Sequence, residues 1–265
     1  MLRDLLTVKI QICGIYMSGH SKWSTIKRKK GANDAKRASV FTKIGREIAV
    51  AVKSGGGDPA SNSKLRDLIA KAKANNVPND NIDRLIKKCI GDGDKSNYEE
   101  MIYEGYGPCG IAVMVEALTD NRNRTAGDLR HYFDKCGGNL GQNGSVSFMF
   151  ERKGIIVIDN EDEKISEDKI FEDAMLDGVL DIKYEEGGIE ISTEPNECSN
   201  VRVALEALGY EFASAEVEYV ASNLNKIDDP DAALKMQKLI DLLEENDDVQ
   251  NVFHNWDMPE EEDED

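Results

Sequence analysis

The sequence predicts an α+β protein of three domains: an N-terminal three-helix bundle followed by two ferredoxin-like α/β domains, one inserted in the other. Apolar residues recur at helical spacing between about residues 33 and 90, whereas they alternate at strand spacing from about residue 98 onward. The chain has 265 residues, of which 40% are hydrophobic, so it can form more than one globular core. No apolar run approaches the ~18–20 residues of a membrane span, so no membrane partner is expected.

Three amphipathic helices are expected in the N-terminal region. The first begins near Asn33 or Asp34 and stops at the glycines 55–57. The second covers about 61–76 and the third about 79–90, with Pro78 between them. Each helix places its apolar residues on one face and its Lys and Arg residues mainly elsewhere, which indicates a small bundle with an apolar core and a cationic surface.

The rest of the chain predicts two sheets. Strands are expected at 98–104, 110–118 and 145–151, with a helix at 122–136. The next six elements have the β-α-β-β-α-β order of ferredoxin-like domains. They are strand 154–158, helix 166–177, strands 180–184 and 189–193, helix 197–208 and strand 214–220. A last helix at 230–245 and a strand at 249–255 can complete the first sheet. The predicted domains are therefore 17–95, a discontinuous 96–152 plus 222–257, and an inserted 153–221.

Both ends of the chain are expected to lie outside these domains. Residues 1–16 contain an apolar stretch that Asp4 and Lys9 interrupt, without a small-residue cleavage site, so they do not resemble a signal peptide. We interpret them as a non-native or disordered extension ahead of a start at Met17, or as a natural short tail. Residues 258–265 are expected to form an acidic disordered tail.

Charge is distributed very unevenly along the chain. The net charge is −18, yet residues 1–95 hold 20 Lys and Arg against 9 Asp and Glu, while residues 96–265 hold 13 against 42. Such asymmetry indicates a polyanion-binding module joined to an acidic body. Because the acidic body repels phosphate, contact with nucleic acid is expected only through the N-terminal third.

The candidate nucleic-acid-binding residues lie in a basic arm, about 18–31, and on the first helix. The arm is rich in Gly and Ser, which leaves the backbone free to approach phosphate, and phosphate contacts need only positive charge and donors. Trp23 can stack on a base or anchor the arm to the bundle, and His20 can donate to phosphate or cap the backbone. The complete set of candidates is His20, Lys22, Trp23, Lys27, Arg28, Lys29, Lys30, Lys36, Arg37, Lys43 and Arg46.

A secondary candidate is the group Arg122, Asn123 and Arg124, which lies where a strand leads into a helix. Helix N-termini bind anions. Ordinary capping by Asp120 or Asn121, with solvated arginines, explains these residues equally well.

No catalytic, cofactor or metal site is predicted. The segment from Gly105 to Gly110 satisfies the spacing G-x-G-x-x-G of dinucleotide-binding sites. However, the residues that follow are typical of a strand and not of a helix, and Pro108 lacks an amide donor. We therefore interpret the segment as a turn between strands. The five cysteines are widely spaced and only three histidines are present, which gives little material for zinc. Reduced thiols indicate a reducing compartment, so a cytoplasmic location is expected.

Several motifs resemble the YebC/PmpR family. They are the opening Ser18-Gly19-His20-Ser21-Lys22-Trp23 followed by Ile26 to Lys30, then Phe41-Thr42-Lys43, Gly105 to Pro108, Asp120 to Thr125, and Gly144-Ser145-Val146. The resemblance covers about residues 17–257. It implies a three-domain architecture and a cytoplasmic role in gene expression. Members are described as transcriptional regulators that bind DNA; others, including a mitochondrial translational activator, act as ribosome-associated factors.

The working prediction is a non-enzymatic, DNA-binding transcriptional regulatory protein. The alternative is a ribosome-associated translation factor that binds ribosomal RNA and relieves stalling at proline-rich sequences. Composition does not choose between them because both targets present phosphates, and the lack of an evident helix-turn-helix or zipper favours the alternative. A third class is a protein–protein adaptor acting through the acidic body.

Overall fold

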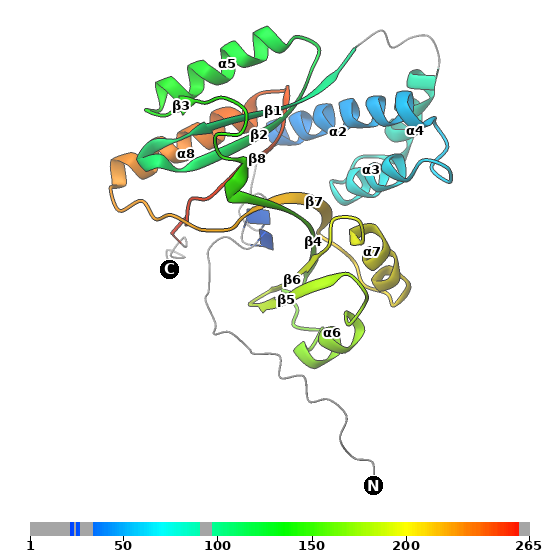
Figure 1. The fold of residues 1–265 in the computed structure, drawn as a ribbon. Helices are drawn as coiled ribbons and strands as arrows, with labels where there is room; N and C mark the ends of the chain where they lie inside the picture. Colours follow the sequence, from blue (N-terminus) through cyan, green and yellow to red (C-terminus); the bar gives the residue numbers. More distant parts are fainter. Residues whose placement is uncertain (1–21, 24, 27–33, 91–96, 260–265) are drawn as a thin grey trace.

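The computed structural model describes residues 22–23, 25–26, 34–90 and 97–259, and three helices of the N-terminal bundle follow one another along the chain (Figure 1). The bundle consists of α2 (Asp34–Gly55), α3 (Ser63–Ala74) and α4 (Asn79–Ile90). The Asn62 side chain accepts a hydrogen bond from the Leu65 amide and thereby caps α3. The buried side chains that the three helices share include Ile44, Ile48, Leu65 and Ile86. The predicted helical domain is confirmed.

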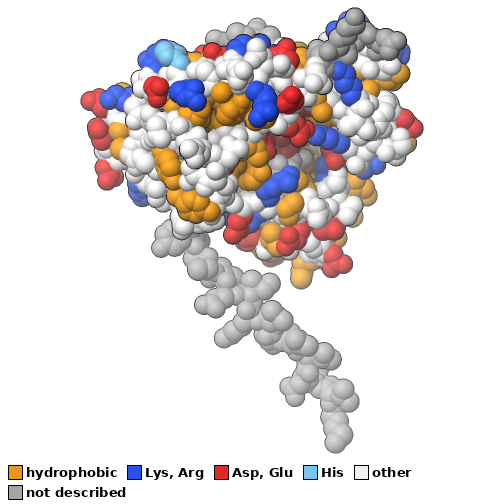
Figure 2. Space-filling model, turned by 45° about the horizontal axis from the view of Figure 1, so that its top comes forward, with side chains coloured by type: hydrophobic (Ala, Val, Ile, Leu, Met, Phe, Trp, Pro, Cys, Tyr) orange, Lys and Arg blue, Asp and Glu red, His pale blue; other side chains and the backbone are white. Residues whose placement is uncertain are grey.

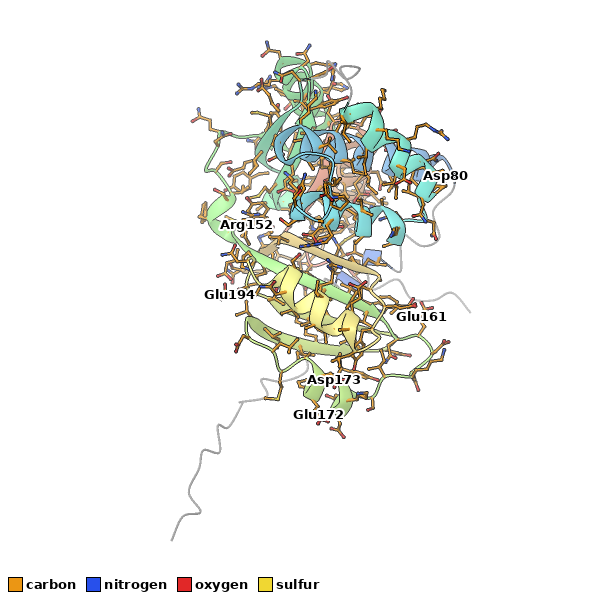
Figure 3. The ribbon with its side chains drawn as sticks, turned by 90° about the vertical axis from the view of Figure 1, so that its right-hand side faces the viewer. Asp80, Arg152, Glu161, Glu172, Asp173 and Glu194 are labelled. Atoms are coloured by element: carbon orange, nitrogen blue, oxygen red, sulfur yellow. The ribbon has the colours of Figure 1, made fainter. Side chains whose placement is uncertain are left out.

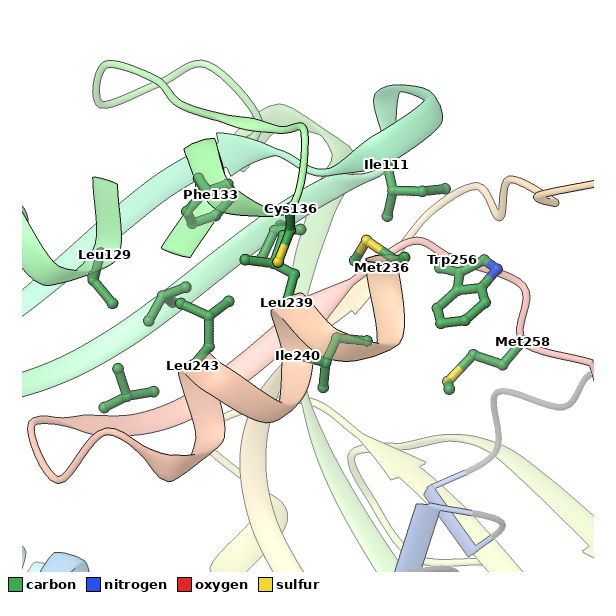
Figure 4. Close-up of a cluster of buried hydrophobic side chains, with 13 residues drawn as sticks. Ile111, Leu129, Phe133, Cys136, Met236, Leu239, Ile240, Leu243, Trp256 and Met258 are labelled. Atoms are coloured by element: carbon green, nitrogen blue, oxygen red, sulfur yellow. The ribbon is translucent and has the colours of Figure 1, made fainter. Parts of the chain in front are cut away.

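A second domain is built on a four-stranded sheet whose last strand comes from the end of the chain. Its order is β3-β1-β2-β8, and neighbouring strands are antiparallel. The elements are β1 (Glu99–Tyr106), β2 (Ala112–Thr119), α5 (Arg122–Lys135), β3 (Asn139–Leu140), α8 (Pro230–Glu245) and β8 (Val249–His254). Helices α5 and α8 cover one face of the sheet, where Phe133, Met236 and Leu239 meet in the core of Figure 4.

The third domain lies in the sequence between β3 and α8. It comprises β4 (Phe150–Asp159), α6 (Glu167–Asp173), β5 (Val179–Glu185), β6 (Gly188–Thr193), α7 (Cys198–Ala207) and β7 (Ser214–Ala221). The strand order β5-β6-β4-β7 with antiparallel neighbours is the ferredoxin-like arrangement that the sequence predicts. We call this unit the inserted domain. The contact between the inserted domain and the sheet of the second domain is apolar and contains Met114, Phe150 and Phe253.

One predicted pair of strands is wrong. Residues 145–151 and 154–158 were expected to be separate strands, but the structure has the short helix η2 (Ser147–Met149) followed by the single long strand β4. Gly154 does not interrupt β4, since it pairs with Thr193. A side chain at Gly154 would collide with Thr193 and with Cys198 of α7, so this glycine permits close packing and does not mark a turn.

The glycine-rich segment after β1 forms a turn between antiparallel strands, as predicted. The short helix η1 (Pro108–Gly110) joins β1 to β2, and no helix follows it that would direct amides at a pyrophosphate. A Cβ at Gly107 would approach the Met236 sulfur to 2.5 Å, so the glycine allows α8 to pack closely against this turn.

Within the described ranges, no helix is long and apolar enough to cross a membrane, and no group of three or more His, Cys, Asp or Glu side chains is arranged to hold a metal ion.

Candidate nucleic-acid interface

The structure describes the side chains of only four primary candidates. His20, Lys27, Arg28, Lys29 and Lys30 lie outside the described residues. Lys36 and Arg37 belong to α2, but their side chains are also outside the described part. The four that remain are Lys22, Trp23, Lys43 and Arg46, and all four contact another domain.

Trp23 is buried against the sheet of the inserted domain. Its side chain is 3% exposed and packs on Ile155 and Val157 of β4. Its indole N–H donates a hydrogen bond of 3.2 Å to the carbonyl oxygen of Glu186. Gly188 leaves the space that the indole ring occupies, because a Cβ there would overlap the ring. Trp23 is therefore an anchor and not an exposed stacking surface, and it anchors to the inserted domain rather than to the bundle.

Lys22 extends this attachment with two polar contacts. Its ammonium lies 2.5 Å from a carboxylate oxygen of Glu218, and its backbone N–H donates to Glu190 at 2.7 Å. Burial alone would lower the pKa of Lys22, but Glu218 and Glu216 outweigh burial and raise it. The ammonium is thus charged and compensated, so it offers little attraction to a phosphate.

Lys43 and Arg46 connect α2 to the end of α8. The Lys43 ammonium donates to the Glu244 carbonyl at 2.5 Å. The Arg46 guanidinium donates to the Asp247 carbonyl and to the Asp248 carboxylate, each at 2.7 Å, and lies 5.4 Å from the centre of the Tyr98 ring. These two cations of the bundle neutralise C-terminal acceptors of the acidic body.

A further ionic contact joins α2 and α3 to the inserted domain. The Lys71 ammonium lies 3.2 Å from Glu47 and 3.1 Å from Glu216 of β7. Arg202 of α7 pairs with Asp67 of α3 at 3.1 Å. The sequence analysis assigned no role to these residues. The alternation of Glu216 and Glu218 with apolar residues is typical of a strand with one polar face, and the sequence alone does not say that the bundle covers that face.

Asp248 is the centre of the secondary candidate region. It is 4% exposed and accepts hydrogen bonds from Arg46, Arg124 and Thr125 at 2.7–2.8 Å, and from Thr119 at 3.2 Å. Burial would raise the pKa of Asp248, but the hydrogen bonds from Arg124, Thr125 and Arg46 lower it. The carboxylate is therefore ionised and joins the bundle, α5 and β8.

The N-terminus of α5 is capped by its own chain. The Asn121 side chain accepts from the Arg124 amide at 3.1 Å, while the Arg124 guanidinium pairs with Asp120 as well as Asp248. Arg122 is largely exposed and lies 3.8 Å from Glu99, and Asn123 is exposed. Of the two interpretations of this segment, the described contacts are those of ordinary capping.

Five exposed cations of the bundle lie on α3 and α4. Arg66 and Lys73 are two turns apart on α3, and Arg84, Lys87 and Lys88 follow i, i+3, i+4 spacing on α4. All five are exposed, and within the described part of the chain none of them forms a salt bridge. We call these five residues the outer cations. Figure 3 shows α3 and α4 toward the viewer, with the acidic inserted domain beneath them.

The inserted domain has the opposite charge. Residues 153–221 hold 19 Asp and Glu against 5 Lys and Arg. Glu161, Glu172 and Glu194 extend from it in Figure 3. On the face seen in Figure 2, by contrast, cationic and acidic side chains are interspersed. The exposed surface of α3 and α4 is thus a part of the described molecule where a polyanion meets mainly positive charge.

Comparison with known proteins agrees with this division into domains. A family model described as the TACO1/YebC protein N-terminal domain matches residues 21–92, and one described as the TACO1/YebC second and third domain matches residues 98–256. The chain belongs to the TACO1/YebC family.

Relatives in this family carry a common description. Proteins from Ruminiclostridium cellulolyticum and Finegoldia magna, each called a probable transcriptional regulatory protein, are 57% and 55% identical; the alignments cover 94% and 91% of this chain and 100% and 99% of those proteins. A crystal structure of a conserved hypothetical protein from Aquifex aeolicus is similar with a TM-score of 0.81 and 45% identity, covering 91% of this chain and 98% of that one. Both of these bacterial relatives are thus named as regulators.

Proposed function

We propose that this protein is a cytoplasmic, DNA-binding transcriptional regulator that contacts DNA through its helical N-terminal domain. The observation that carries the proposal is the surface formed by the outer cations, with which no carboxylate of the described residues forms a salt bridge. The names of the TACO1/YebC relatives support the regulatory role. No residue is assigned a catalytic role.

The outer cations and the basic arm supply the contact. On the exposed surface of residues 53–90 there are seven Lys and Arg against three Asp and Glu. The arm adds His20 and Lys27 to Lys30, and the start of α2 adds Lys36 and Arg37. Lys22, Trp23, Lys43 and Arg46 serve instead to hold the domains together. The binding is dominated by phosphate contacts, which position the protein without reading sequence.

The acidic inserted domain orients the complex. A negative unit attached beside the cationic bundle repels phosphate, so the paired segment of the DNA is expected to lie on the side of α3 and α4. The same repulsion weakens any complex in which the phosphates face the acidic inserted domain.

Binding of a duplex DNA at increasing salt concentration tests the proposal. If roughly five to seven phosphates are neutralised, log K falls with log[salt] at a slope of about −4 to −6. Replacing all five outer cations with Ala is expected to weaken binding strongly and to make the slope shallower. Two exposed lysines of α8, Lys235 and Lys238, replaced with Ala, are the control.

Two outcomes count against the proposal. Equal affinity of the outer-cation variant and the unmodified protein would remove its basis. Co-sedimentation with ribosomes at moderate salt, together with preference for ribosomal RNA over DNA, would replace DNA with RNA as the target. A separate variant with Ala at Lys27, Arg28, Lys29 and Lys30 measures the contribution of the arm.

A further inference from the structure

The connection from β3 to β4 is an unusual segment for this chain. Residues 136–150 contain no charged side chain, whereas 32% of the whole sequence is charged. This stretch holds four glycines and includes β3 and η2, and its part between β3 and β4 is green in Figure 1. In an otherwise acidic body, it is a surface that does not repel phosphate.

The buried carboxylate of Glu104 fixes the shape of this connection. Glu104 is 5% exposed and accepts hydrogen bonds from the backbone N–H groups of Gly144 and Val146, each at 2.7 Å, and of Ser147 at 2.8 Å. Burial would raise the pKa of Glu104, but these amides outweigh it and lower the pKa, so the carboxylate stays ionised. Hydrogen bonds to an ionised carboxylate are strong, and three of them fix the backbone of residues 144–147 to Glu104.

Additional contacts limit the freedom of the loop on both sides. The Tyr106 hydroxyl donates to the Ser145 carbonyl at 2.8 Å, and the Gly141 amide donates to the Glu104 carbonyl at 2.8 Å. Val146 is fully buried, and Phe150 is 7% exposed. The loop is therefore anchored before and after the residue at its tip.

That tip residue is Phe148, which is 73% exposed. An aromatic ring gains nothing for the fold when it lies in water, and here a buried ionised group is used to hold the backbone that carries it. Two amide side chains on the same loop, Gln142 and Asn143, are also exposed. An exposed ring on the same connection as exposed amide groups offers what a nucleobase needs: a stacking surface and partners for the base edge.

We propose that this loop is a second contact for nucleic acid, in which Phe148 stacks on an unpaired base of the bound DNA. The inference rests on the proposed function for its ligand. It assigns the bundle to phosphates and the loop to a base that has left the duplex stack. Stacking on an aromatic side chain tolerates any base, so the loop adds preference for unpaired DNA without a sequence requirement.

A comparison of DNA substrates tests the proposal. The probes are a fully paired duplex and the same duplex with a short unpaired stretch of thymines. The variant Phe148→Ala is expected to bind the paired duplex normally and to bind the partly unpaired one about five- to 150-fold more weakly, the range expected for loss of one stacked base. Leu234→Ala, at a residue 70% exposed on α8, is the matched control and is expected to change neither affinity.

A fluorescence experiment gives an independent result. The two natural tryptophans, Trp23 and Trp256, are each 3% exposed, so Phe148→Trp introduces an exposed indole on a protein whose other indoles are shielded. Stacking on a base is expected to quench its emission with the partly unpaired DNA and not with the paired duplex. The same sequence as RNA, used as a third probe, tells whether the 2′-hydroxyl matters.

The outcomes separate this inference from the proposed function. Equal affinity of Phe148→Ala and the unmodified protein for the partly unpaired DNA, with no quenching of emission from the Phe148→Trp variant, would overturn the loop site. That result would leave salt-dependent duplex binding through the outer cations intact. Conversely, an effect of Phe148→Ala in a protein whose outer-cation variant binds normally would refute the bundle surface and retain the loop.

Discussion

Asp248 offers the most demanding test of how the three domains are held together. Its carboxylate receives Arg46 from the bundle, Arg124 from α5, and two threonine hydroxyls from the sheet domain. The variant Asp248→Asn keeps the volume of the side chain but removes the charge that the two arginines share. We expect it to destabilise the protein and to loosen the bundle from the body.

The magnitude follows from the exposure of the partners. Removing one partner of a buried ion pair costs about 3–5 kcal/mol. Arg46 is only 19% exposed, so its contact approaches that range, whereas Arg124 is 47% exposed and solvent screens its pair with Asp248. Because asparagine retains one acceptor oxygen, we expect a loss of about 2–3 kcal/mol.

Urea unfolding followed by tryptophan fluorescence measures this loss, since Trp256 lies in the core of the sheet domain. Asp247→Asn is the control, because Arg46 contacts only the carbonyl of that residue and its exposed side chain is expected to matter by less than about 0.5 kcal/mol. A double-mutant cycle with Arg46→Ala is expected to give a coupling of at least about 1 kcal/mol. A loss for Asp248→Asn no larger than that of the control would refute the reasoning.

Three further outcomes are expected. Gly188→Ala should displace Trp23, shift its emission to longer wavelength and destabilise the protein by about 1–3 kcal/mol, because a Cβ at residue 188 would overlap the indole ring. Unchanged emission would mean that the position of the indole does not depend on the space beside Gly188. Gly127→Ala, in open space on α5, should instead stabilise by about 0.5–1 kcal/mol in thermal melts, and a loss would contradict the described packing. Folding lowers the pKa values of Glu104 and Asp248 below the ordinary values of 4.5 and 3.8. The two carboxylates therefore stabilise the folded protein fully when the pH is above these ordinary values, and this contribution is lost as the pH falls through the lowered pKa values. Glu104→Gln should therefore reduce the acid-induced fall of the unfolding free energy, and an unchanged pH profile would exclude that contribution.

Much of the fold follows from local patterns. The helices of the bundle could be predicted from apolar spacing and the stops at Gly55 and Pro78, because an amphipathic helix is determined by residues within a few turns. The β-α-β-β-α-β order predicted the inserted sheet for the same reason. The error at residues 145–151 arose from the alternation of Val146, Phe148 and Phe150, which is typical of a strand. The structure instead has the short helix η2 at Ser147–Met149, and β4 begins only at Phe150.

The candidate site was less predictable than the fold. The sequence alone determined that most cations lie in the first third of the chain and most acids in the rest. It also predicted the order of the elements from β4 to β7, and its motifs are those of the TACO1/YebC family. It could not determine which cations face outward. Lys43 and Arg46 share a helix with exposed residues, yet α8 and Asp248, some 200 positions away, neutralise them. Only the tertiary structure decided that Trp23 is buried and that the outer cations form no ion pairs within the described residues. It also decided that Glu104 binds the backbone amides of residues 144, 146 and 147, next to the exposed Phe148. Each of these features depends on contacts between segments that are distant in the sequence, so no local pattern predicts them.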